Sequence, residues 1–481
     1  MRLSKRFKLG KTQFELDFVD IDTDKDLRVF LDPHFLANRS DPWSIDASRT
    51  IRSFFRHFLT LLRSGKEAEA RELFSHLNEP NETCLGMSKG RPKGRGIGDE
   101  FADRLFESLK GSNAVASGLV KDLEDSQIFI RGIGKDLTSD MTTNIIRGHL
   151  LSYTEAQCKL WGIDLTSGVA SGWIWDRNQL AWTSGYVPRL VVGQQPLLLV
   201  PKAVVSYVKQ YSGKKYHQHF ILPYLQHEHL RMNSVLVKTR KNRYAERYVT
   251  KKDIVEAEAK FSKEYLAKFT QQHPEVFANF RRDVTTRLVS LSDNDLTKAD
   301  RDAVIEHLIS ALKTITTGGQ DATRYHRTVV GILELLFYPD LMSPQIEQEI
   351  HEGRKRVDIT FDNAATGGFF WRLHKKVGIP CAYIFVECKN YSREVANPEL
   401  DQLAGRFSVN RGKFGLLLCR SIDDMDHFLQ RCADTHKDGR GTILPLVDED
   451  LIQMLISLQS GDARPWETFL TDRLREVVLA R

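Results

Sequence analysis

The sequence predicts an α/β protein: a C-terminal mixed sheet of four or five strands flanked by helices, preceded by an α+β N-terminal region. Two apolar runs, at 382–389 and 414–419, have the length and composition of buried strands. Segments with helical spacing of apolar residues stand before and between them, at 321–337 and 397–407. A chain of 481 residues exceeds what one hydrophobic core usually serves, so we expect two or three domains.

The composition is that of a globular protein, with 41% hydrophobic and 27% charged residues. No apolar run reaches the roughly 18 residues of a membrane span, and the basic start of the chain is not followed by the apolar segment of a secretory signal. Six cysteines are scattered without a Cys-x-x-Cys pair, which argues against a zinc ribbon and against a disulfide framework. We therefore expect a cytoplasmic protein without a membrane partner.

Several segments of the N-terminal region, 28–31 and 189–192 among them, are predicted as strands. Phe14, Leu16 and Phe18 alternate with polar residues, which predicts a half-buried strand within 12–21. A second apolar stretch, 128–130, runs into glycines and is also predicted as a strand.

Dense helical periodicity over 253–315 ends at Thr316-Thr317-Gly318-Gly319-Gln320, a stretch typical of a hinge. We place the main domain boundary there. This gives an N-terminal region of 1–317, divisible near 160–180, for recognition, sensing or oligomerisation, and a C-terminal domain of 318–481.

Basic residues alternate with glycine and proline in the stretch GMSKGRPKGRGIGDE, at Lys89, Arg91, Lys93 and Arg95. Glycine lets backbone N–H groups approach an anion, and the cations suit phosphates, so we expect nucleic-acid contact here. The stretch does not match the Gly-x-x-x-x-Gly-Lys-Ser/Thr pattern of a P-loop. A solvated surface loop explains the composition equally well, both here and in a second basic cluster over 238–252.

The C-terminal elements follow in the order helix, three strands, helix, strand. A basic turn, Arg354-Lys355-Arg356, joins the first strand, within 345–352, to the second strand, 357–361, and is expected to contact nucleic acid. The third strand carries the run Tyr383-Ile384-Phe385-Val386 and ends in charged residues. Charges at the end of a buried strand are costly unless they are paired or bind something.

Glu387 and Lys389 are two positions apart at this strand end, so their side chains project from one face while Cys388 points to the other. Asp358 joins them if its strand pairs with this one. Two carboxylates beside a lysine suit Mg²⁺, which can activate a water and offset the charge of a phosphate. A buried Glu387–Lys389 ion pair without catalytic function is the alternative.

This arrangement resembles the PD-(D/E)xK nuclease superfamily, especially the Mrr-type restriction endonuclease branch, over residues 321–445. The matching pieces are Asp358 in RVDITF, the motif Glu387-Cys388-Lys389 in FVECKN, and Gln402 in the following helix. The upstream helix carries Glu334 as a further catalytic candidate. The sequence departs from the family pattern in a valine before Asp358 and in a long insertion before the third strand.

The resemblance implies a role for each matching residue. Asp358, Glu387 and the backbone carbonyl of Cys388 would bind Mg²⁺, a site that Mn²⁺ could also occupy. Lys389 would serve the attacking water, and Gln402 would support the site.

The resemblance also implies a restriction-endonuclease-like fold and a Mg²⁺-dependent endonuclease that hydrolyses double-stranded DNA, in bacterial defence against phage or foreign DNA. Cutting both strands favours a homo-oligomer, because two symmetry-related sites can meet two strands. Two alternatives stay open. One is an RNA or single-strand nuclease gated by a ligand bound in the N-terminal region, and the other is a non-catalytic nucleic-acid-binding protein that retains the fold.

Overall fold

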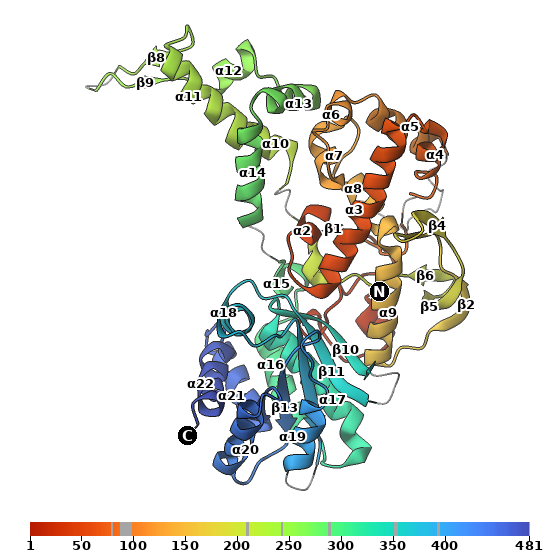
Figure 1. The fold of residues 1–481 in the computed structure, drawn as a ribbon, viewed down its shortest axis with the longest axis vertical. Helices are drawn as coiled ribbons and strands as arrows, with labels where there is room; N and C mark the ends of the chain where they lie inside the picture. Colours follow the sequence, from red (N-terminus) through yellow and green to blue (C-terminus); the bar gives the residue numbers. More distant parts are fainter. Residues whose placement is uncertain are drawn as a thin grey trace.

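A computed structural model describes residues 1–77, 80–86, 99–207, 211–241, 244–286, 290–350, 355–391 and 395–480. These residues form a largely helical N-terminal unit, a C-terminal unit built on a sheet, and an arm that projects from the N-terminal unit (Figure 1). The predicted mixed α/β class is confirmed. No helix in the described ranges combines the length and the apolar character needed to cross a bilayer.

The N-terminal unit packs helices around α3, with short strands at its side. α7 covers the first two residues of the predicted strand at 128–130 and ends at Phe129, so these residues are helical, and only Ile130, just after the helix, has extended backbone. The elements are α1 (Leu3–Arg6), η1 (Gln13–Glu15), β1 (Phe30–Leu31), α2 (Pro33–Ala37), α3 (Pro42–Arg63), α4 (Glu67–Glu72), α5 (Asp99–Lys110), α6 (Asn113–Ala116), α7 (Leu123–Phe129), α8 (Lys135–Ile145), α9 (Arg147–Trp161), β2 (Thr166–Ala170), β3 (Ile174–Asp176), β4 (Ala181–Thr183), β5 (Tyr186–Val192), β6 (Gln195–Leu197), η2 (Lys202–Val204) and β7 (Val205–Ser206).

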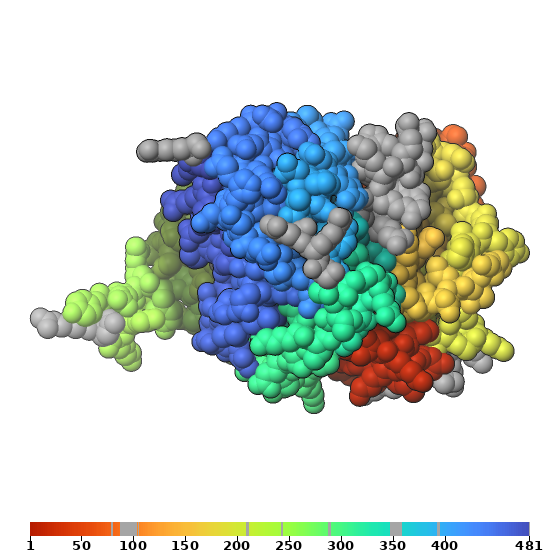
Figure 2. Space-filling view, turned by 90° about the horizontal axis from the view of Figure 1, so that it is seen from below, coloured from red at the N-terminus to blue at the C-terminus, as the bar shows by residue number. Residues whose placement is uncertain are grey.

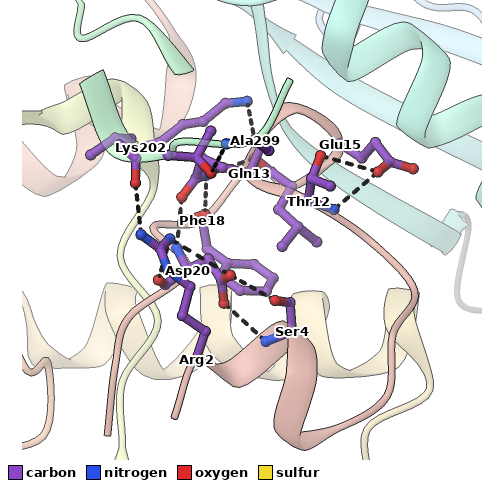
Figure 3. Close-up of polar contacts among 12 residues, drawn as sticks. Arg2, Ser4, Thr12, Gln13, Glu15, Phe18, Asp20, Lys202 and Ala299 are labelled. Atoms are coloured by element: carbon purple, nitrogen blue, oxygen red, sulfur yellow. Dashed lines mark hydrogen bonds and ion pairs between the residues drawn. The ribbon is translucent and has the colours of Figure 1, made fainter. Parts of the chain in front are cut away.

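The segment 12–21 is not the half-buried strand that its alternation predicts, because its polar residues are buried like its apolar ones. It begins with the 3₁₀ turn η1. The side chain of Gln13 donates to the carbonyl of Phe18 at 2.8 Å and accepts from the N–H of Asp20 at 2.9 Å (Figure 3). Ser4 donates through its N–H and its hydroxyl to the carboxylate of Asp20, at 2.9 and 2.7 Å. The polar positions therefore face protein groups and not water.

The C-terminal unit is built on a five-stranded sheet in the order β10-β11-β12-β13-β14. β10, β11 and β12 are antiparallel neighbours, whereas β12, β13 and β14 are parallel. β13 is buried along its whole length, as parallel strands covered on both faces usually are. The bounds are β10 (Leu341–Ile350), β11 (Lys355–Asn363), β12 (Tyr383–Lys389), β13 (Phe414–Cys419) and β14 (Thr442–Val447), of which the sequence did not predict β14.

Two groups of helices cover this sheet, α16 with α17 and α21, and α19 with α20 and α22. The predicted boundary at 317 falls between α16 and α17, yet α16 packs against α17 and α21 and so belongs to the C-terminal unit. The bounds are α15 (Asp293–Leu296), α16 (Arg301–Thr314), η4 (Gly319–Asp321), α17 (Ala322–Phe337), α18 (Gly368–Arg372), η5 (Leu373–Val377), α19 (Asn397–Ala404), α20 (Met425–Lys437), α21 (Asp448–Gln459) and α22 (Trp466–Val478).

The arm consists of one continuous helix, a two-stranded hairpin and three further helices (Figure 1). Its elements are α10 (Gly213–Tyr216), the π-helical turn η3 (His217–Ile221), α11 (Leu222–Met232), β8 (Lys238–Thr239), β9 (Arg247–Tyr248), α12 (Lys251–Ala257), α13 (Lys263–Gln272) and α14 (Pro274–Thr286). The helices after the hairpin, together with α15 and α16, confirm the predicted helical character of 253–315.

Candidate active site

The candidate site lies at the carboxyl end of β12, the central strand of the sheet. Pairing of β12 with β11 ends at Val386, whereas its pairing with β13 continues to Lys389, which lies beside Cys419. The last three residues of β12, 387–389, therefore extend beyond the part of the strand that pairs with β11. Its last residues lie where polar side chains can approach from the β11 side.

Asp358 approaches from β11. It adjoins Ile359, which lies opposite Val386. Continuing this register places Asp358 opposite Glu387, so the two carboxylates project from the same face of the sheet. The Oδ2 of Asp358 accepts a hydrogen bond from the N–H of Cys388 at 3.0 Å. The carboxylate is thereby held against the end of β12.

Two cations contact the fully buried carboxylate of Glu387. Its Oε1 accepts from Lys389 Nζ at 2.7 Å, and its Oε2 forms an ion pair with Arg406. Lys389 Nζ also donates to Gln402 Oε1 at 3.1 Å, from the neighbouring α19. With Asp358, the cluster holds two formal negative and two formal positive charges, so its charges balance. The cluster Asp358, Glu387, Lys389, Gln402 and Arg406 is called the strand-end cluster below.

Arg406 is the member that sequence reasoning missed. It lies two residues beyond α19 and is buried. Burial lowers the pKa of its guanidinium, against the opposing effect of the Asp358 carboxylate. A signal was present, because Arg406 follows Gln402 by four residues, the spacing of neighbours on one face of a helix.

The donor types in the strand-end cluster fit a hard cation. Asp358 and Glu387 offer carboxylate oxygens, and Cys388 offers a carbonyl at the same strand end, which are the ligands that Mg²⁺ prefers beside water. Both oxygens of Glu387 contact cations, so a metal ion would replace one of these contacts. No group of three or more His, Cys, Asp and Glu side chains is arranged to hold a metal within the described ranges.

Glu334 lies elsewhere. Tyr325, on the same helix α17, donates to Asp448, which directly follows the carboxyl end of β14, at 2.9 Å. Glu334 is nine residues further along, about 13 Å by the rise of an α-helix. Its ion-pair partner is Lys202 of the N-terminal unit, at 3.5 Å. Its predicted catalytic role is therefore not carried into the function proposed below.

Lys202 is the centre of a second buried group of charges, between the two units. Its Nζ lies 2.9 Å from Asp293 Oδ1, and the carboxyls of Glu334 and Asp17 also surround it. Burial acts to lower the pKa of Lys202, but the nearby carboxylates outweigh it and the pKa is raised. Tyr153 donates to Asp17 Oδ2 at 2.6 Å. The set Asp17, Tyr153, Lys202, Asp293 and Glu334 is called the junction cluster below.

The carboxyls of the junction cluster are shifted toward the protonated form. Burial raises the pKa of Glu334 well above its usual value, and the Asp17 carboxylate raises it further. Burial also raises the pKa of Asp17 and of Asp293, against the attraction of Lys202. Among the residues that the structure describes, neither oxygen of Glu334 has a well-formed hydrogen bond. A protonated Glu334 fits this environment better than a carboxylate does.

The predicted nucleic-acid contacts fall mostly outside what the structure describes. Lys89, Arg91, Lys93 and Arg95 lie in the gap 87–98, and Arg354 lies in the gap 351–354. The backbone of β11 includes positions 355 and 356, but the side chains of Lys355 and Arg356 are not among those described. Their contact with nucleic acid stays a prediction.

Comparison with known proteins bears on the N-terminal part of the chain. Residues 8–212 match the family model of a domain of unknown function, DUF8370. No curated protein matches the chain. No solved structure matches it either. The strand-end cluster lies outside the matched residues.

Proposed function

We propose that this protein is a Mg²⁺-dependent endonuclease that hydrolyses DNA phosphodiester bonds, with a restriction-endonuclease-like C-terminal unit. One observation carries the proposal: Asp358, Glu387 and Lys389 converge at one end of a mixed sheet. Gln402, which the resemblance implied as a supporting residue, contacts Lys389. The antiparallel β10–β12 and parallel β12–β14 suit the fold of the PD-(D/E)xK superfamily that the sequence resembles.

The side chains of the strand-end cluster have separable tasks in this proposal. Asp358 and Glu387 would hold the metal ion, with the carbonyl of Cys388. When bound, Mg²⁺ makes a water more acidic and offsets negative charge on the phosphate. Lys389 is fixed between Glu387 and Gln402, so its ammonium can orient the attacking water or a phosphate oxygen. Arg406 adds a guanidinium that can bind phosphate oxygens in a bidentate manner.

The decisive test is cleavage by the full chain and by Asp358→Asn, a variant of nearly the same shape. Supercoiled plasmid, single-stranded DNA and RNA are each incubated with Mg²⁺ or with EDTA. We expect the wild-type chain alone to cut, and only with Mg²⁺. The preferred substrate decides between a DNA nuclease and an RNA or single-strand nuclease. A chain that cuts none of the three, yet binds them, is the non-catalytic alternative.

Double-strand cutting by a homo-oligomer is the finer form of the proposal, because one such site meets one strand at a time. Light scattering gives the oligomeric state, and the ratio of nicked to linear plasmid over time gives the cutting mode. A monomer that produces nicked circles alone contradicts this form. A role in defence against foreign DNA is proposed by analogy, from a nuclease unit joined to a separate N-terminal unit.

A pocket of about 500 Å³ favours the second candidate, a nuclease gated by a ligand. Trp43, Tyr153 and Trp175 line it from the N-terminal unit, and Gln345 of β10 lines it from the sheet. The N–H of Trp43 donates to Asp362 at 3.1 Å, on the strand that carries Asp358. A planar ligand stacked on these aromatic rings would therefore contact both units.

A panel of nucleotides tests the gated form. We expect one of them to raise the cleavage rate of the wild-type chain and to lose that effect in Trp43→Leu, because the ring supplies a stacking surface. Trp371→Leu, outside this pocket, is the control and should respond like the wild type. Equal activation of all three proteins would place the ligand elsewhere.

A further inference from the structure

The outer part of the arm is built as an element of its own. The hairpin β8–β9 connects α11 to α12 and lies at the far end of the arm (Figure 1). Leu222, Val249, Ile254 and Ala259 form a small core beneath it, separate from the main core of the molecule. Seen from below, the arm extends well beyond the body of the protein (Figure 2). The exposed surface of the hairpin therefore packs against neither the small core of the arm nor the main core.

The hairpin and the residues that flank it carry a local excess of positive charge. The described residues of this stretch, 231–241 and 244–252, contain seven Lys or Arg and one acidic residue, Glu246. The chain as a whole has 69 basic and 63 acidic residues, so the hairpin stretch is far more basic than the chain average. Its nearest acidic residues, Glu228, Asp253 and Glu256, lie in the helices on either side. Such a concentration of positive charge attracts polyanions.

The cations of the hairpin are exposed and their partners hold them weakly. Lys238 pairs with Asp253 at 2.7 Å, and Arg240 pairs with Glu246 at 3.4 Å, both at the surface. Exposed ion pairs of this kind contribute little to stability, so another anion can replace the partner. Lys241 and Arg247 are exposed beside them.

The cations lie on both faces of the hairpin. Lys238 is opposite Tyr248, and the Arg240 guanidinium stands over the ring of Tyr248, 5.6 Å from its centroid. Arg247 is opposite Thr239, and this neighbouring pair projects from the other face. A hairpin that docked on a flat anionic surface would carry its cations on one face. The major groove of DNA admits a two-stranded ribbon and presents phosphates on both of its sides.

The arm and the strand-end cluster lie far apart. Along the longest axis of the molecule, which is vertical in Figure 1, the hairpin lies at the top, and α19, which carries Gln402, lies at the bottom. The hairpin therefore cannot serve as a wall of the candidate active site of its own chain. Any duplex that it holds is contacted at a distance from that site.

We propose that the hairpin β8–β9 is a duplex-DNA-binding element that enters the major groove and anchors the substrate at a position remote from the scissile bond. Lys238, Arg240, Lys241 and Arg247 contact phosphates on the two sides of the groove. The role of the bound duplex as substrate rests on the function proposed above, whereas the binding itself does not.

Binding is measured in the full chain carrying Asp358→Asn, with EDTA, so that cleavage plays no part. The test variant adds Lys238→Gln, Arg240→Gln, Lys241→Gln and Arg247→Gln. The matched control removes four exposed cations from other surfaces, Arg63, Lys376, Lys437 and Arg475, in the same way. Filter binding to a random-sequence duplex is followed from about 50 to about 200 mM salt.

We expect the hairpin variant to bind at least about tenfold more weakly at about 100 mM salt, because four phosphates are no longer neutralised. The slope of log K against log salt should flatten by up to about 3.6, or roughly 0.9 for each of these phosphates. The control should change the slope by less than about 0.9. Equal effects of the two variants would overturn the proposal, since only total charge would then matter.

Two further measurements exclude misfolding of the variant and binding to a membrane surface as explanations. Circular dichroism and thermal melting must match between the variants, because the substituted residues lie outside the small core of the arm. Vesicles of equal parts phosphatidylcholine and phosphatidylglycerol offer the same negative charge on a flat surface. Loss of vesicle binding, with duplex affinity unchanged in the hairpin variant, would overturn the proposal in favour of a membrane. A chain that binds duplex through the hairpin but cuts nothing would overturn the proposed nuclease function alone.

Discussion

Lys389 and Lys202 are both buried among carboxyl groups, but the balance of charge around them differs. In the strand-end cluster, Lys389 and Arg406 balance Asp358 and Glu387, and each oxygen of Glu387 contacts a cation. In the junction cluster, one cation, Lys202, lies among the three carboxyls of Asp17, Asp293 and Glu334, whose pKa values burial raises. The strand-end cluster thus pairs each charge of Glu387 with a cation and is where we propose that a metal ion and a phosphate bind, whereas burial shifts the carboxyls of the junction cluster toward their neutral form.

The largest expected effect separates Asp358 from Glu334. Asp358→Asn should lower the cleavage rate by at least about a thousandfold, since a neutral amide is a poor metal ligand and leaves developing charge uncompensated. Glu334→Gln should change that rate by less than about threefold. Plasmid nicking with Mg²⁺ measures both, and thermal melting checks that both variants fold. A Glu334→Gln variant as inactive as Asp358→Asn would break the comparison.

The second test exchanges the two lysines for methionine, which keeps their length. Lys389→Met should lower the cleavage rate by about 100-fold or more and still bind Mg²⁺, because lysine acts on water or phosphate and not on the metal. Lys202→Met should instead destabilise the chain by about 3–5 kcal/mol, since it leaves buried carboxyls without a cation. Calorimetric Mg²⁺ titration and urea unfolding distinguish the two. Loss of metal binding in Lys389→Met would contradict the role assigned to that residue.

The third test asks whether a metal ion competes with Arg406 for the carboxylate of Glu387 in the strand-end cluster. Arg406→Gln removes one partner of a buried ion pair and should destabilise the chain without metal by about 3 kcal/mol. Mg²⁺ should recover more stability in this variant than in the wild type, because one Glu387 oxygen no longer has a competing cation. The measurement is the melting temperature with and without Mg²⁺. An identical Mg²⁺ effect in the two proteins would show that the metal does not compete with Arg406.

The smallest expected effect concerns pH and the junction cluster. A carboxyl whose pKa is higher in the folded than in the unfolded state leaves the folded state with more bound protons, so stability falls as pH rises above the unfolded value, near 4.3 for Glu. Glu334→Gln removes this titration. The variant should therefore gain stability over the wild type as pH rises from about 5 to 8, with a melting temperature higher by about 2 °C at the upper end.

Melting curves of the two proteins at four pH values measure this difference. Glu228→Gln, at the surface of the arm, is the matched control and should show no such trend. A difference between Glu334→Gln and wild type that shrinks with rising pH would mean that Glu334 is ionised in the folded chain. The junction would then resemble the strand-end cluster.

Sequence alone located the strands that carry the candidate site, because their apolar runs are continuous and flanked by clear turns. The motif Glu387-Cys388-Lys389 and the later helix with Gln402 were readable in the same way. The alternation within 12–21 led to a wrong strand prediction. The Gln13 side chain donates to the carbonyl of Phe18, a backbone group that in a strand would accept from a neighbouring strand. β14 was missed although its residues, Thr442–Val447, form an apolar run that is almost wholly buried.

The sequence by itself determined the α/β class, the helix and strand order of the sheet up to β13, and the residue types at the end of β12. These are local properties, set by the period of apolar residues and by turn chemistry. Only the tertiary structure decided which charges meet. Arg406 reaches Glu387 because α19 packs beside β13, and Glu334 turns to Lys202 because α17 extends toward the other unit. Pairing between distant charges depends on how elements pack, which no local pattern encodes.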